Sequence, residues 1–123
     1  MKMLFFMFSM LLFPVQDEVM KDIGTAMKAG SAKELIKFCN NTVEIKINGE
    51  SSNYSKAQAE VILREFFVKN APTNFVYIHQ GSSEGLNYTI GRYTHASGAH
   101  RVVMIIKKVE DKYLIDTLNF SQE

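Results

Sequence analysis

The chain has 123 residues, close to the usual size of one domain, and its 46% hydrophobic and 22% charged residues are typical of a folded globular protein rather than a disordered or fibrous one. Lys and Arg number 14 against 13 Asp and Glu, so there is no basic excess with which to displace counterions from phosphates, and we expect no nucleic-acid partner.

The N-terminal segment, residues 1–16, has the pattern of a signal peptide. Lys2 precedes an apolar run from Met3 to Val15 that only Ser9 interrupts, and this run is shorter than the roughly 20 residues of a membrane-spanning helix. We therefore expect an exported periplasmic or cell-envelope protein with a mature domain over residues 17–123 and no membrane contact after cleavage. Because the small-x-small cleavage pattern is missing, the cleavage point stays open, and an uncleaved anchor is the alternative.

Two helices are expected to follow this leader. In the first of them, apolar residues recur at helical spacing: Val19, Ile23, Ala26 and Met27. Gly30 follows at the position where a residue in the left-handed conformation would end this helix. Ser31 and Glu34 then form a capping box, which predicts a second helix that carries Leu35, Phe38 and Cys39 and stops at Asn40-Asn41.

One strand and a third helix come next. Val43, Ile45 and Ile47 alternate with charged residues, which indicates a half-buried strand ending at Asn48-Gly49. A second capping box, Ser55 with Gln58, opens a helix with a broad apolar stripe: Ala59, Ile62, Leu63, Phe66 and Phe67.

After Pro72 the sequence changes to β-branched and aromatic runs separated by turn residues. We predict strands near 74–80, 86–94, 99–109 and 112–120, with turns at 81–85, Ser97-Gly98 and Glu110-Asp111. Short connections make neighbouring strands antiparallel. The fold class predicted is α+β, with three N-terminal helices packed on a strongly curved, mainly antiparallel sheet in the order helix, helix, strand, helix, four strands.

This element order resembles the nuclear transport factor 2-like, or cystatin-like, superfamily. Three segments also resemble a family of short exported Bacteroidetes proteins of unknown function: 54–60 leading into Phe66-Phe67, 88–93, and 101–103. The resemblance covers nearly the whole mature chain and implies the fold and export. It carries no catalytic residues, and a superfamily that includes isomerases, dehydratases and binding modules leaves the function open.

Cysteine and histidine are candidates for chemistry. Cys39 is the only cysteine, so no internal disulfide can form, and its helical spacing favours a buried, inert thiol. With a turn at Ser97-Gly98, His95 lies directly opposite His100 on one face. Two ligands are too few for a structural zinc, so we expect solvated turn histidines and no metal site. His79 is expected to be a polar strand end in the same way.

A second set of candidates comes from carrying the register through Glu110-Asp111, which pairs Ile105 with Asp116. One apolar sheet face then carries three polar groups, Tyr88, Arg92 and Asp116, which we name as ligand-pocket candidates beneath the third helix. The favoured alternative is a structural ion pair between Arg92 and Asp116. A slip of one residue would move this set to the other face.

Function remains divided between two classes. The leading expectation is an exported, non-catalytic binding module for a small molecule or an envelope protein, without a cofactor. The alternative is a cofactor-free lyase or isomerase acting in the sheet cavity, which is disfavoured because Asp116 is the only well-placed acid. Residues 102–106 are apolar at both parities while the helices can cover one face, so we also expect a homodimer through the sheet.

Overall fold

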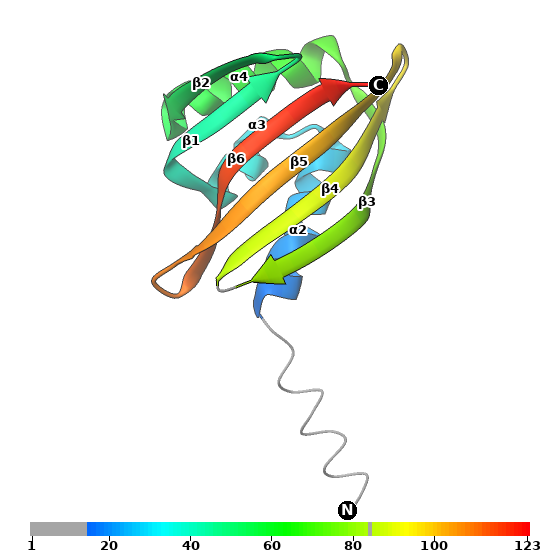
Figure 1. Cartoon of the computed structure of the whole chain (residues 1–123). Helices are drawn as coiled ribbons and strands as arrows, with labels where there is room; N and C mark the ends of the chain where they lie inside the picture. Colours follow the sequence, from blue (N-terminus) through cyan, green and yellow to red (C-terminus); the bar gives the residue numbers. More distant parts are fainter. Residues whose placement is uncertain (1–14, 84) are drawn as a thin grey trace, which may run out of the picture.

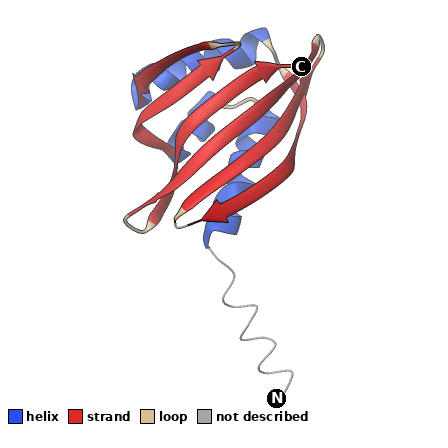
Figure 2. Ribbon diagram, viewed as in Figure 1, coloured by secondary structure: helices blue, strands red, loops and turns tan. Residues whose placement is uncertain are grey.

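The computed structural model describes residues 15–83 and 85–123, in which helices cover one face of a sheet whose other face is open (Figures 1 and 2). The signal peptide predicted over 1–16 lies outside the described residues except for Val15 and Gln16, which begin the first helix. No helix in the described part of the chain is long and apolar enough to cross a membrane.

Helix α2 (Val15–Ala29) buries the predicted stripe, since Ile23 and Met27 are fully buried. It ends as predicted at Gly30, whose φ of 64° is left-handed. The Gly30 N–H bonds to the Met27 carbonyl at 3.1 Å and the Ser31 N–H to the Ala26 carbonyl at 3.0 Å. These are the two hydrogen bonds of a Schellman C-cap, so the prediction is confirmed.

The second helix is shorter than predicted. Ser31 Oγ accepts a hydrogen bond from the Glu34 N–H at 3.1 Å, as the capping box required, but α3 (Ala32–Leu35) is a single turn that continues as the 3-10 helix η1 (Ile36–Phe38). The predicted helical residue Cys39 instead begins a strand, because its backbone turns extended at φ −90° and ψ 150°.

Strand β1 (Cys39–Ile47) is followed by a strand that the prediction missed, β2 (Glu50–Ser55). Asn48 and Gly49 join the two with positive φ angles of 49° and 94°, the combination that a tight two-residue hairpin turn requires. Only one residue of β2, Tyr54, is large and apolar, so hydrophobic alternation could not reveal the strand.

Helix α4 (Lys56–Lys69) begins at the predicted capping box, and both hydrogen bonds are present: Gln58 N–H to Ser55 Oγ at 3.3 Å and Ser55 N–H to Gln58 Oε1 at 3.1 Å. The side of the helix that faces the sheet is buried: Ala59, Leu63, Phe66 and Phe67.

Four long strands complete the sheet: β3 (Pro72–Ser83), β4 (Leu86–His95), β5 (Gly98–Val109) and β6 (Lys112–Gln122). The spatial order is β2-β1-β6-β5-β4-β3, and all neighbours are antiparallel except β1 and β6, which run parallel. The predicted α+β class is confirmed, with six strands in the described residues rather than five.

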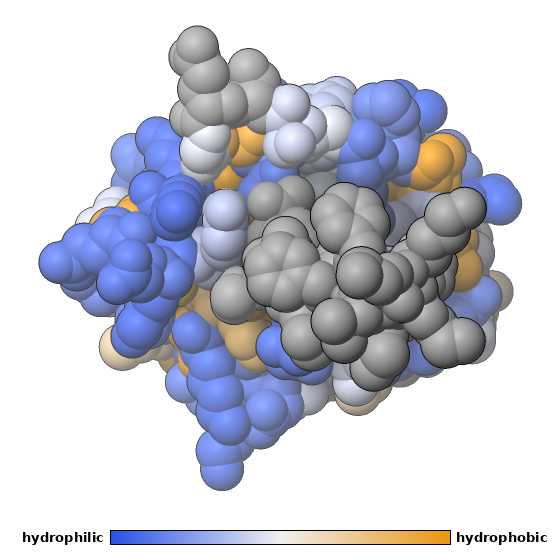
Figure 3. Space-filling view, turned by 90° about the horizontal axis from the view of Figure 1, so that it is seen from below, coloured by the Kyte–Doolittle hydropathy of each residue, from blue (hydrophilic) through white to orange (hydrophobic). Residues whose placement is uncertain are grey.

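The two faces of the sheet differ. We call the face covered by the helices the inner face and the other the outer face. On the inner face, Phe66 of α4 packs against Phe120 at a ring-centroid distance of 4.3 Å and against Tyr93 at 5.5 Å. At the end of the molecule that holds the β3–β4 and β5–β6 turns, the surface outside the grey atoms is mostly hydrophilic (Figure 3).

Candidate ligand pocket

A pocket of about 530 Å³ opens between α4 and the sheet, at the end where β1 runs into the Asn48-Gly49 turn. Its walls come from β1, β2, α4, β5 and the C-terminal end of β6. The apolar and aromatic lining residues are Ile45, Ile47, Tyr54, Ile62 and Phe66, and the polar or charged ones are Asn48, Glu50, Glu65, Lys69, Asn70, His100 and Gln122.

Local sequence explains how the walls are placed. The capping box at Ser55 fixes where α4 begins, so Ile62 and Phe66, one helical turn apart, turn toward the pocket. In β1, Ile45 and Ile47 are two residues apart and therefore share a face. The pocket thus has apolar side chains from β1 and α4 on part of its wall, and polar or charged side chains, among them the exposed Glu65 and Lys69, on the rest.

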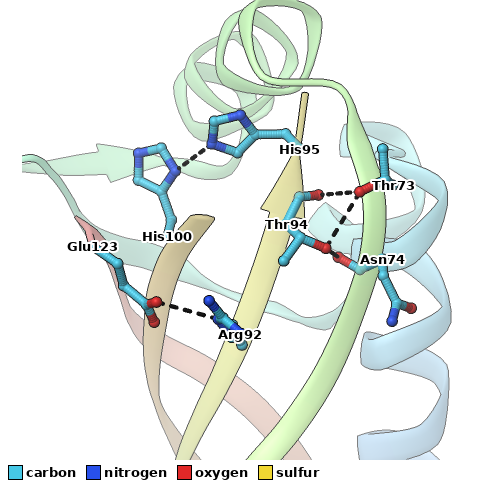
Figure 4. Close-up of polar contacts among 7 residues, drawn as sticks. All are labelled: Thr73, Asn74, Arg92, Thr94, His95, His100 and Glu123. Carbon is cyan, nitrogen blue, oxygen red and sulfur yellow. Dashed lines mark hydrogen bonds and ion pairs between the residues drawn. The ribbon is translucent and has the colours of Figure 1, made fainter. Parts of the chain in front are cut away.

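Two histidines from neighbouring strands meet beside this pocket (Figure 4). His95 in β4 and His100 in β5 are 9% and 2% exposed, and His95 Nε2 lies 3.0 Å from His100 Nδ1. His100 also lines the pocket and meets the edge of the Phe66 ring at a centroid distance of 5.1 Å. The prediction of solvated turn histidines is therefore wrong.

The error lies in the turn. The β4–β5 hairpin turns at Ala96-Ser97, because His95 pairs with Gly98 and Tyr93 pairs with His100. His95 and His100 are therefore diagonal neighbours on one face rather than directly opposite residues. Sharing a face was predicted correctly, and that face is the buried one.

Both nitrogens of His95 have hydrogen-bond partners, whereas only one nitrogen of His100 has a partner among the described residues. The Ser97 backbone N–H donates to His95 Nδ1 at 3.3 Å. His100 Nε2 is buried without a hydrogen-bond partner among the described residues. Burial, and to a lesser degree the neighbouring His95, lowers the pKa of His100 below its ordinary value of 6.5, so this imidazole is kept neutral.

The predicted ligand-pocket candidates lie elsewhere. Tyr88, Arg92 and Asp116 are all on the outer face, and none of them lines the pocket under α4. The predicted ion pair is also wrong: Arg92 Nε pairs with Glu123 Oε1 at 3.2 Å (Figure 4), and Asp116 pairs with Lys107 Nζ at 3.3 Å. A role for these three residues in binding a ligand stays a prediction, and such a ligand would occupy the open side of the sheet.

A bulge explains this displacement. The register counted from Glu110-Asp111 holds as far as the pair Ile106–Ile115, but Ile105 then pairs with Thr117 rather than with Asp116. The extra residue, Asp116, shifts everything beyond it by one position. Leu118 and Phe120 are therefore fully buried on the inner face, whereas Arg92 is on the outer face.

The remaining candidates are structural or exposed. Cys39 is free and fully buried, as predicted, and burial raises the pKa of its thiol to about 12. His79 is exposed near the outer-face ring of Tyr88. The described residues contain no cluster of three or more His, Cys, Asp or Glu suited to a metal ion.

Sequence reasoning missed His100 as a pocket residue, although a signal was present. Arg101, the residue next to His100 in β5, is charged and exposed, which favours an outward-facing side chain at position 101. His100, one residue away, is then expected to point inward. The tertiary contact with Phe66 of α4 has no comparable signal.

Residues 20–121 match the family described as "Domain of unknown function (DUF4783)". The chain is similar to a DUF4783 family protein from Bacteroides ovatus, with 33% identity, a TM-score of 0.81, and coverage of 83% of this chain and 93% of that one. No curated protein matches the chain.

More distant solved structures share the fold alone. A domain of unknown function with a cystatin-like fold from Nostoc punctiforme has 12% identity and a TM-score of 0.67, covering 86% of this chain and 74% of that one. A protein named Rd1NTF2_04 with long sheet has 14% identity and a TM-score of 0.67, covering 85% of this chain and 98% of that one. The predicted nuclear transport factor 2-like fold is thereby confirmed.

Proposed function

This chain belongs to the DUF4783 family of domains of unknown function, and we propose a function from its own geometry. It is a binding module that holds a small molecule with both apolar and polar parts between α4 and the sheet, without transforming it. The observation that carries the proposal is the pocket of about 530 Å³, which has the size of a typical small-molecule site.

The chemistry of the walls supports this class of ligand. Ile47 and Ile62 are half-buried and offer apolar surface that a ligand can cover, whereas Ile45 and Phe66 line the pocket but are almost fully buried. Burial of apolar area is the main source of affinity in such sites. The charged residues at the opening, such as Glu65 and Lys69, remain exposed to solvent. A ligand with an apolar body and a polar end toward the solvent fits this distribution.

Binding is favoured over the alternative of a lyase or isomerase. Cofactor-free proton transfer requires a base held close to the substrate, usually in a partly buried position that tunes its pKa. The pocket carboxylates, Glu50 and Glu65, are both exposed. His100 is neutral, and its Nδ1 is already engaged with His95.

A blocking substitution tests the proposal. Ile62→Trp adds an indole inside the pocket, whereas Val68→Trp adds the same group at a position on α4 that is 78% exposed and does not line the pocket. We expect an NMR titration with acetophenone, a small aryl ketone, to show binding by the wild type and by Val68→Trp and a loss of binding in Ile62→Trp. Equal binding by both variants would contradict the proposal.

The proposed setting is the cell envelope, and its support is the leader pattern of residues 1–16. An intact-mass measurement on protein isolated from its native host should show a product that lacks the run from Met3 to Phe13. A product that retains Met1 would indicate an anchored protein instead.

We also propose that a second copy of the chain covers the outer face. Five apolar side chains gather there: Val76, Tyr88, Ile90, Val103 and Ile105. Val76 is 47% exposed and Tyr88 is 40% exposed. Charges of both signs flank them, such as Arg92 and Asp116, which a two-fold axis can bring into opposition.

Ile105→Asp should convert a dimer to a monomer in analytical ultracentrifugation, while Val68→Asp on α4 should leave the dimer intact. Met104 is not suited to this test, because it is fully buried on the inner face. A wild-type chain that sediments as a monomer at high concentration would overturn the proposed dimer.

A further inference from the structure

The hydrogen-bond chain that ends at the pocket fixes which atom of His100 carries a proton. It starts at the Ser97 backbone N–H, which can only donate, so His95 Nδ1 must accept and the neutral His95 ring carries its proton on Nε2. That proton points to His100 Nδ1, 3.0 Å away, which must accept in turn. A neutral His100 then has its own proton on Nε2.

We propose that this relay holds His100 as an N–H donor for the pocket, and that the ligand carries a neutral oxygen acceptor, such as a ketone, ester or amide carbonyl, on an apolar body. The proposal rests on the proposed binding function and specifies the ligand class. His100 is 2% exposed and lines the pocket, and its Nε2 has no partner in the described part of the chain.

The unpaired N–H of His100 has an energetic consequence. A buried N–H without a partner destabilises the structure by roughly 1–3 kcal/mol, and a ligand oxygen that accepts from it recovers much of this energy. Because Nε2 is shielded, the oxygen reaches it only when neighbouring side chains shift slightly. The bond is therefore made in a dehydrated setting, where it is stronger than in water.

The surroundings favour a neutral acceptor over a carboxylate. The rings nearest His100 are uncharged: Phe66 at 5.1 Å, His95 at 5.0 Å and Tyr93 at 6.5 Å between centroids. Among the described residues that line the pocket, Lys69 is the one cation, and it is exposed; Glu50 and Glu65 add negative charge. A carboxylate buried at this point would lack a positive partner, which is strongly unfavourable.

The first test reads the tautomer directly. Nitrogen-detected NMR of the histidine rings at about pH 7 should show His100 neutral with its proton on Nε2. His95→Phe removes the donor to His100 Nδ1 and should release the other tautomer. A wild-type His100 found with its proton on Nδ1, or as an imidazolium, would overturn the proposal whatever the pocket binds.

The second test compares acetophenone with cumene, which has the same number of heavy atoms but a methyl group in place of the carbonyl oxygen. We expect His100→Phe to lower the ratio of acetophenone affinity to cumene affinity by roughly tenfold relative to the wild type, the effect of one hydrogen bond. Using the ratio removes the difference in hydrophobicity between the two probes. His79→Phe, an exposed histidine on the outer face, is the matched control and should leave the ratio unchanged.

The outcomes separate the two proposals. An unchanged ratio in His100→Phe, with both probes still bound in the pocket, would overturn the acceptor specificity and leave the binding function standing. Absence of binding by either probe to the wild type would overturn both. If His100→Phe does not fold, displacement of the wild-type His100 Nε2 resonance by acetophenone but not by cumene supports the proposal, and its displacement by neither contradicts it.

Discussion

Gly91 occupies an inner-face position where any side chain would collide with its neighbour across the strands. A Cβ atom there would lie 2.4 Å from Phe75 Cζ and 2.5 Å from Phe75 Cε1, far inside van der Waals contact. We predict that Gly91→Ala destabilises the fold by about 1–3 kcal/mol, because the Phe75 ring, 5% exposed, has little room to move.

Urea unfolding measures this effect, and Gly81→Ala provides the control. Gly81 also lies in a paired segment of β3 and β4. The nearest atom to a Cβ added at Gly81 would be His79 Nε2 at 3.9 Å, an ordinary contact. The control should change the free energy of unfolding by less than about 0.5 kcal/mol. Equal effects of the two substitutions would show that Phe75 does not restrict position 91.

Single residues also mark where sequence reasoning stops. Asp116 looks like any other strand residue, yet its bulge decides which side chains of β6 face inward. The turn at Ala96-Ser97 differs from the predicted Ser97-Gly98 by one position, which was enough to misplace two histidines. Both features depend on how neighbouring strands fit together, and no periodicity within one strand encodes that fit.

At the level of elements, local signals were reliable wherever the backbone itself carries them. The cap at Ser55, the C-cap at Gly30 and the turn at Asn48-Gly49 were all predicted, because each depends on a few adjacent residues. Strand β2 was missed because its polar residues gain their order only by pairing with β1. The pocket is out of reach in the same way, because its walls come from elements distant in sequence.

A hydrogen bond between a side chain of β3 and the backbone of α2 joins this helix to the sheet. Tyr77 Oη in β3 donates to the Met20 carbonyl at 2.7 Å, and burial raises the pKa of this phenol, so it stays protonated as a donor. We predict that Tyr77→Phe lowers the free energy of unfolding by about 0.5–1.5 kcal/mol and speeds hydrogen exchange in α2. Tyr88→Phe on the outer face should change neither the stability nor the hydrogen exchange of α2. If Tyr77→Phe also left the free energy of unfolding unchanged, apolar packing alone would hold the helix.

For the whole molecule, the neutral His100 links stability to pH. Its pKa is lowered in the folded state, so the unfolded chain takes up the proton first as the pH falls. The contribution of the neutral His100 to the free energy of unfolding is fully present above the pKa of the unfolded state, 6.5. It is lost as the pH falls from 6.5 toward the lower pKa of the folded state. Urea unfolding at about pH 7 and about pH 5 should show lower stability at the acidic value, with a smaller difference in His100→Phe. Stability that rises toward acid would contradict this.

We propose that this protein binds its ligand in the pocket between α4 and the sheet. The most direct measurement is an NMR map of backbone amide shifts during titration with acetophenone. We expect the shifts to concentrate at Ile47, Ile62 and His100. Shifts concentrated instead at Tyr88 and Arg92 would place binding on the outer face of the sheet and contradict the claim.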